Sequence, residues 1–179
     1  GVIPAAGGGS RFGAGTPKQY ATLAGAPLLA KTLERLQAGL PFEQVVVAIA
    51  RDDAHYEHVI GARQGVVAIR CGGLTRAATV KGALDALADR CADDDWVLVH
   101  DAARPCVPKA ALLRLVAQLW DDAVGGLLAI PLADTLKRAD TMAGVDADVP
   151  RVLATEDRAG LWRAQTPQMF RYRLMCQAF

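Results

Sequence analysis

Five short apolar runs alternate with amphipathic stretches along the chain, and this alternation limits the folds that it can adopt. The runs are Val2–Ala6, Gln44–Ala50, Val66–Arg70, Trp96–His100 and Gly126–Pro131. Each is almost continuously apolar, which is typical of strands that are covered on both faces. Alternation of such strands with helices predicts right-handed crossovers. We therefore expect an α/β fold with a three-layer, doubly wound, mostly parallel sheet.

The stretches between the runs carry apolar residues at helical spacing. The first repeat includes Leu29, Leu33 and Leu36, and the last follows Pro108, a residue type favoured in the first turn of a helix. A middle helix contains Val80, and its start lies either at Thr75 or at the glycines before it.

The pattern changes after Pro131. Asp134–Arg138 and Val152–Asp157 are short and polar, and they flank a connector rich in Gly, Asp and Pro. We interpret residues 132–158 as a two-stranded arm that projects from a single domain covering residues 1–179. A two-stranded arm has no core of its own and is marginal in water. The arm is therefore expected to pack against a second copy in a homodimer.

Composition excludes several classes of partner and compartment. The 179 residues include 20 Lys and Arg against 19 Asp and Glu, a net charge of +1, so electrostatic capture of nucleic acid is not expected. No apolar run approaches the roughly 18 residues of a membrane span. The four cysteines are scattered without a CxxC pair, which favours reduced thiols and a cytoplasmic protein.

A glycine-rich segment follows the first apolar run and is the first candidate for chemistry. It reads Pro-Ala-Ala-Gly-Gly-Gly-Ser-Arg from Pro4 to Arg11, and Pro-Lys-Gln-Tyr follows at 17–20. Small residues let backbone N–H groups approach phosphate oxygens, and Arg11 and Lys18 add positive charge. Neither the GxxxxGK[ST] nor the GxGxxG spacing is present here. The plainer interpretation is a turn that merely joins two elements, but the two cations favour a phosphate site.

Several motifs in order resemble the 2-C-methyl-D-erythritol 4-phosphate cytidylyltransferases of the sugar-nucleotidyltransferase superfamily. The first is Ala-Ala-Gly-x-Gly-x-Arg with the downstream Pro-Lys-Gln-Tyr. The others are Cys-Gly-Gly at 71–73 with Arg76 and Thr79, His-Asp-Ala-Ala-Arg-Pro at 100–105, Asp-Thr-Leu-Lys-Arg at 134–138, Glu-Asp-Arg at 156–158, and Thr-Pro-Gln at 166–168. The resemblance extends over essentially the whole chain and implies a Rossmann-like nucleotidyltransferase fold.

The resemblance also implies a reaction and its residues. The family transfers CMP from CTP to methylerythritol phosphate with Mg²⁺ and releases pyrophosphate, a step in making isoprenoid precursors. The implied catalytic residues are Arg11, Lys18 and Arg158. CTP is expected to bind at Pro4, Ala5, Ala6, Gly7, Gly8, Gly73, Thr79 and Ala102. The acceptor is expected to bind at Asp101, Arg104, Thr135, Arg158 and Thr166, with Thr135 and Arg158 acting across a dimer interface.

Asp101 also has interpretations that do not depend on the resemblance. It ends an apolar strand, where ligands bind in open α/β sheets, so it is a candidate ligand for Mg²⁺ or for an acceptor hydroxyl. A turn or cap carboxylate is the plainer alternative. Similarly, Arg104 is either a clamp on the acceptor phosphate or one half of a surface salt bridge.

Two departures from the family pattern bear on function. Leu74 stands where the family usually has a polar or acidic residue, which weakens the inference that the base is cytosine. Further family residues lie in a segment beyond Phe179, so we expect the chain to lack that segment. Two alternatives stay open: a cytidylyltransferase for another polyol phosphate such as ribitol 5-phosphate, and a nucleotide-binding module without catalysis.

Overall fold

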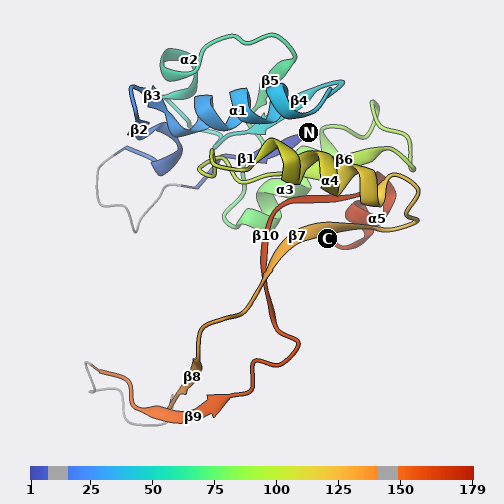
Figure 1. Ribbon diagram of the computed structural model, residues 1–179. Helices are drawn as coiled ribbons and strands as arrows, with labels where there is room; N and C mark the ends of the chain where they lie inside the picture. Colours follow the sequence, from blue (N-terminus) through green and yellow to red (C-terminus); the bar gives the residue numbers. More distant parts are fainter. Residues whose placement is uncertain (8–15, 141–148) are drawn as a thin grey trace. The chain divides into compact units, whose positions relative to one another are not determined.

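The chain folds into two compact units, which Figure 1 shows as ribbons. The computed structural model describes residues 1–7, 16–140 and 149–179. The first unit comprises Gly1–Leu128 and Thr166–Phe179, and the second comprises Ala129–Gln165.

A six-stranded sheet with the order β5-β4-β1-β6-β10-β7 forms the centre of the first unit. Its strands are β1 (Val2–Pro4), β4 (Val45–Ala48), β5 (Val66–Ile69), β6 (Trp96–Val99), β7 (Gly125–Pro131) and β10 (Trp162–Arg171). The last residues of β7 and the first residues of β10 are counted in the second unit. β1 runs parallel to β4 and β6, and β4 runs parallel to β5, whereas β10 runs antiparallel to β6. The predicted mostly parallel sheet is confirmed.

Alternate side chains of the strands enter two separate cores, one on each face of the sheet. Ile3, Val47 and Leu98 pack with α1 (Leu28–Gly39) and α4 (Lys109–Leu119). Their sequence neighbours on the strands pack with α3 (Arg76–Asp85) and α5 (Tyr172–Gln177) on the other face. The period-two pattern of a strand produces this division. The predicted three-layer, doubly wound arrangement is therefore confirmed (Figure 1).

Smaller elements complete the first unit. They are the 3₁₀ turn η1 (Lys18–Tyr20), the short strands β2 (Thr22–Leu23) and β3 (Ala26–Pro27), and the one-turn helix α2 (Tyr56–Val59). Among the helices in the described part of the chain, none has the length and apolarity to cross a membrane.

The predicted strand boundaries need correction. β1, β4, β5 and β6 end before Ala6, Ala50, Arg70 and His100, where the apolar runs placed their ends. Burial continues beyond the last paired residue, because Ala5, Ile49 and His100 are almost inaccessible. The apolar runs therefore report burial, and burial extends past the ladder into the loops that follow. The last of the five predicted strands, β7, begins one residue earlier than predicted, at Gly125.

The second unit contains an antiparallel pair, β8 (Leu136–Ala139) and β9 (Val152–Glu156). The sequence predicted these strands at Asp134–Arg138 and Val152–Asp157, so the pairing is confirmed with shifted ends. Leu136 lies opposite Glu156, and Arg138 forms an ion pair with Glu156 at 2.5 Å. Val152 and Leu153 are each more than 60% exposed, at 63% and 62%. The pair therefore buries little apolar surface within its own unit.

Candidate active site

Loops from β1, β4 and β5 meet at the carboxyl edge of the parallel strands. Gly72, in the loop after β5, donates its N–H to the carbonyl of Ile49 at 2.9 Å. A Cβ placed on Gly72 would lie 2.3 Å from the Cβ of Ala6 and 2.7 Å from the Ile49 oxygen. Only a glycine fits there, and its absence of a side chain lets the three loops touch. Ligands bind at this edge in open α/β sheets.

The loop after β1 contains the residues predicted to line a triphosphate. Ala5 is buried and donates its N–H to the carbonyl of Ala48 at 2.8 Å, which extends the β1–β4 contact beyond the ladder. Pro4 ends the strand, Ala6 is partly exposed and Gly7 is exposed. Gly8 and Arg11 lie outside the described residues.

Lys18 begins the turn η1 and is exposed. The next residue, Gln19, donates its side-chain Nε2–H to the Ala5 carbonyl at 2.7 Å. That bond holds the turn η1, and Lys18 with it, close to the end of β1.

Gly73 and Thr79 are brought together where helix α3 begins. Thr75 caps the helix, accepting the N–H of Ala78 at 3.0 Å, and this decides between the two predicted starts. The hydroxyl of Thr79 accepts the Gly73 N–H at 3.1 Å and lies 3.0 Å from the Thr75 carbonyl, to which it donates. Leu74, between the two glycines and the cap, has a fully exposed side chain.

Asp101 lies between two arginines just after β6. Its Oδ1 accepts the Arg76 Nε–H at 2.8 Å, and its Oδ2 lies 3.0 Å from Arg104 Nε. Its backbone N–H is 3.3 Å from the buried hydroxyl of Thr166 at β10, the hydroxyl being the acceptor. Arg76 also reaches the side-chain oxygen of Gln168 at 3.5 Å. Three of the residues predicted to bind the acceptor are thus gathered in one place.

His100 and Thr32 fix the backbone that carries Asp101. The imidazole of His100 is inaccessible, and its Nε2 lies 2.9 Å from the Arg104 carbonyl. A carbonyl only accepts, so Nε2 carries the proton, and burial lowers the pKa of His100. On the opposite side, the Thr32 hydroxyl of α1 donates to the carbonyl of Ala102 at 2.8 Å. The loop is held from both sides.

Sequence reasoning missed two contacts of this site. Arg76 appeared only as part of a motif, and Gln168 only as part of Thr-Pro-Gln; neither was assigned a role. A signal was available for Arg76, because a helix that follows a strand and a short glycine loop begins at the carboxyl edge of the sheet, where ligands bind. Thr135 and Arg158 belong to the second unit, where Thr135 is exposed and the Arg158 guanidinium donates to the carbonyl of Ala133.

The site offers little to hold a metal by protein side chains alone. Within residues 1–7, 16–140 and 149–179, no three His, Cys, Asp or Glu side chains come together as a metal-binding group. Asp101 supplies a single carboxylate, and both of its oxygens already contact guanidinium groups. This donor set fits a protein-held Mg²⁺ poorly.

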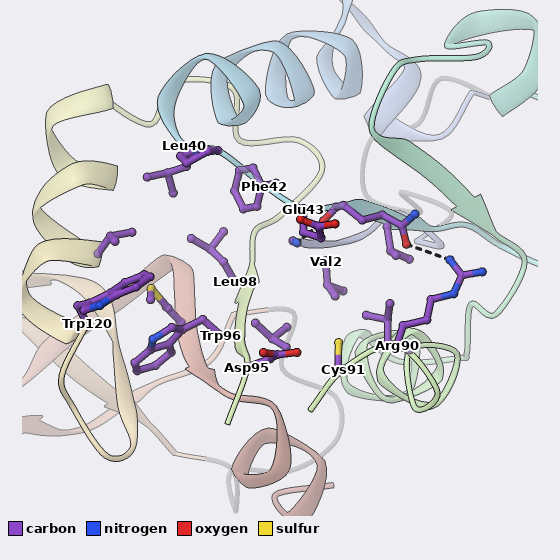
Figure 2. A pocket seen from close by; sticks show the side chains of 18 residues that line it. Val2, Leu40, Phe42, Glu43, Arg90, Cys91, Asp95, Trp96, Leu98 and Trp120 are labelled. Atoms are coloured by element: carbon purple, nitrogen blue, oxygen red, sulfur yellow. Dashed lines mark hydrogen bonds between the residues drawn. The ribbon is translucent and has the colours of Figure 1, made fainter. Parts of the chain in front are cut away.

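A cavity of about 680 Å³ lies at the other edge of the sheet. Figure 2 shows its wall, which includes Val2, Phe42, Trp96 and Trp120. These residues belong to the amino ends of the strands or to the segments around them. Of the described residues that the sequence predicted for the site, none lines this cavity. The cavity is therefore separate from the candidate site.

Comparison with known proteins places the chain in a family. The family profile of 2-C-methyl-D-erythritol 4-phosphate cytidylyltransferase (IspD) matches residues 1–179. A protein of that name from Dechloromonas aromatica is 53% identical over 99% of this chain and 75% of its own length. The corresponding protein from Thiobacillus denitrificans is 47% identical over 99% of this chain and 76% of its own length.

Solved structures agree with the sequence comparison. A crystal structure of a 4-diphosphocytidyl-2C-methyl-D-erythritol synthase has a TM-score of 0.82 and 37% identity, covering 99% of this chain and 76% of that one. The cytidylyltransferase from Francisella tularensis has a TM-score of 0.76 and 34% identity, covering 99% of this chain and 74% of that one. The chain belongs to the 2-C-methyl-D-erythritol 4-phosphate cytidylyltransferase family.

Proposed function

We propose that this chain transfers CMP from CTP to 2-C-methyl-D-erythritol 4-phosphate and releases pyrophosphate. One observation carries the proposal in a chain of this family: Ala6 after β1 lies against Gly72 after β5, and Arg76, which follows that loop, pairs with Asp101 after β6. The family resemblance assigns the triphosphate, the base and the acceptor to these three loops.

The reaction needs positioning and positive charge more than it needs a base. A phosphate oxygen of the acceptor attacks the α-phosphorus of CTP, a new P–O bond forms, and the bond to the β-phosphate oxygen breaks in line. The attacking oxygen is already an anion, so no proton has to be removed. The barrier comes from bringing polyanions together and from charge on the transferring group. We assign the neutralising cations to Lys18 and Arg11.

The nucleotide contacts follow from the arrangement of the loops. We propose that backbone groups of Pro4 to Gly8 line the triphosphate, as small residues permit close approach. Gly73 and Thr79 are the proposed contacts for the base, and Ala102 is a further proposed CTP contact. The Thr79–Gly73 hydrogen bond supports this assignment, because it fixes the orientation of the Gly73 peptide before CTP arrives.

We propose that the acceptor contacts come from two copies of the chain. We assign the acceptor hydroxyls and phosphate to Asp101, Arg104 and Thr166 of the first unit. Thr135 and Arg158 of the second unit complete the acceptor site in a homodimer, each from the partner copy, and Arg158 keeps the catalytic role that the resemblance implies. The exposed apolar side chains of β9 support an arm that packs on another copy.

The proposal also includes a Mg²⁺ ion and a cytoplasmic location. We propose that Mg²⁺ arrives as part of the substrate, bound to the phosphates of CTP, because ions of this kind are usually held by one or two carboxylates together with substrate phosphates. Asp101 could bind such an ion only by giving up one of its two guanidinium contacts. A cytoplasmic location suits the four cysteines, all of which are free thiols in the described residues.

Pyrophosphate release tests the proposal. The chain is assayed with CTP, Mg²⁺ and methylerythritol phosphate, against ribitol 5-phosphate as acceptor and against ATP, GTP and UTP as donors. Release with CTP and methylerythritol phosphate alone is the expected result, and it would show that Leu74 is tolerated. Release with ribitol 5-phosphate instead would identify that polyol phosphate as the acceptor. Failure of every pair, from folded protein, would favour a nucleotide-binding module without catalysis.

A further inference from the structure

The turn that carries Lys18 is fixed to the core by the two residues that follow it. Gln19 donates to the Ala5 carbonyl, and the Tyr20 hydroxyl donates to Oδ2 of Asp53, each at 2.7 Å. All three side chains are buried, with exposures of 6% for Gln19, 4% for Tyr20 and 9% for Asp53. Lys18 itself is exposed. An exposed cation thus directly precedes two buried anchors that reach different loops.

Asp53 is a rigid anchor. Its Oδ1 accepts the backbone N–H groups of His55 and Tyr56, at 2.8 and 3.0 Å, where α2 begins. Its own carbonyl accepts a hydrogen bond from Arg70 at 2.8 Å. A carboxylate whose two oxygens both have partners has little freedom to rotate. The Tyr20 hydroxyl therefore meets an acceptor whose position is set by the loop after β4.

Tyr20 keeps its proton and acts as the donor. Burial raises the pKa of the Tyr20 hydroxyl well above its ordinary value, and the hydrogen bond to Asp53 raises it further. The ring also packs against His55, with centroids 5.4 Å apart. Both the ring and the hydroxyl therefore hold the turn against the same loop.

We propose that Gln19 and Tyr20, together with Asp53, are positioning residues that set the place of Lys18 at the site. The inference rests on the proposed function, since it assumes that Lys18 meets the phosphates of CTP. Two anchors, one on the loop after β1 and one on the loop after β4, fix the backbone one and two residues from Lys18. A cation stabilises a developing charge best when it is already in place before the reaction.

The test measures CTP affinity and turnover in a double-mutant cycle. Tyr20→Phe removes only the hydroxyl, and it is made both in the unaltered chain and together with Lys18→Ala. Tyr172→Phe is the matched control: its buried hydroxyl donates to the Leu84 carbonyl at 3.0 Å, in the core on the face covered by α3 and α5. Gln19→Met removes the other anchor and gives a second variant should Tyr20→Phe fail to fold.

If Tyr20 acts through Lys18, the effects of Tyr20→Phe and Lys18→Ala on CTP binding and turnover should not add. Tyr20→Phe should weaken CTP binding and lower turnover by roughly ten-fold, the effect of one lost hydrogen bond together with a displaced cation. In the Lys18→Ala background the same change should have no further effect, because the cation is gone. Tyr172→Phe should lower the melting temperature about as much as Tyr20→Phe does, but it should leave CTP affinity unchanged.

Other outcomes overturn the inference. It fails if Tyr20→Phe has the same effect with and without Lys18, if it leaves CTP affinity unchanged, or if Tyr172→Phe weakens CTP binding equally. It also fails if the unaltered chain binds no CTP. If the chain binds CTP but releases no pyrophosphate with any acceptor, only the proposed function is contradicted. The CTP affinities of the four variants in the cycle then still decide the role of Tyr20.

Discussion

Gly72 lies against Ala6 so closely that a Cβ on Gly72 would come within 2.3 Å of the Ala6 Cβ. The two residues follow different strands, β5 and β1, which are separated by β4 in the sheet. The Ile49 carbonyl and the Ala50 Cα close the same space, at 2.7 and 3.1 Å. The proposed nucleotide loops are therefore packed on one another through backbone atoms that cannot rotate away.

Gly72→Ala should destabilise the fold and displace the loops. Overpacking of a close contact costs roughly 1–3 kcal/mol, and the upper end is expected here because one obstacle is a backbone oxygen. We expect a lower free energy of unfolding in urea and weaker CTP binding. Gly7→Ala is the stability control, because a Cβ there meets nothing within 4 Å. Equal stability of the two variants would contradict the close packing.

The hydroxyl of Thr79 should matter more than its methyl group. Thr79 is 3% exposed, and its Oγ1 accepts the Gly73 N–H. Thr79→Val keeps the shape but leaves that N–H and the Thr75 carbonyl without this partner, at a cost of about 1–3 kcal/mol. Thr79→Ser keeps the hydroxyl. Titration with CTP and UTP should show a loss of affinity in the valine variant alone, and a loss in both would assign the effect to packing.

The parallel part of the sheet could be predicted because burial on two faces leaves a clear signal. Val45 to Val47 alternate between the two cores, so every residue of the run is apolar. β10 was not predicted as a strand. It contains Arg163, Gln165 and Gln168, and its first residues are exposed, so neither alternation nor a continuous apolar run marks it.

The polar contacts of the site could be predicted only in part. Asp101 and Arg104 lie three residues apart, so a motif contains both. Gln19 meets Ala5 and Arg76 meets Asp101 only after the chain has folded, since 14 and 25 residues separate them. Such pairs depend on the tertiary arrangement of loops, which periodicity does not report.

Asp101→Asn should impair the acceptor step while leaving stability almost unchanged. Arg76 and Arg104 are nearly half exposed, at 47% and 46%, and exposed ion pairs contribute about 0–1 kcal/mol. The proposed acceptor contact needs the negative charge. Initial rates should show a higher KM for methylerythritol phosphate with CTP affinity unchanged. A large fall in melting temperature would instead assign Asp101 a structural role.

The free energy of unfolding should fall as the pH drops below about 6.5, the ordinary pKa of a histidine, because His100 is buried. Burial lowers the pKa of His100 in the folded state, so between the two pKa values the unfolded state binds more protons. Stability rises with pH wherever that holds, by at most about 1.4 kcal/mol per pH unit for one group. The contribution is complete above the unfolded pKa and is lost as the pH falls toward the folded one.

Urea unfolding at pH 5.5, 6.5 and 7.5 measures this dependence, and His100→Gln isolates it. The glutamine amide can still donate to the Arg104 carbonyl, as Nε2 does at 2.9 Å, but it does not titrate. We expect the variant to lose a distinct part of the pH dependence between pH 7.5 and 5.5, whereas the control His58→Gln, at an exposed histidine, keeps it. Identical pH dependence in His100→Gln and the unaltered chain would show that the buried imidazole is not the titrating group.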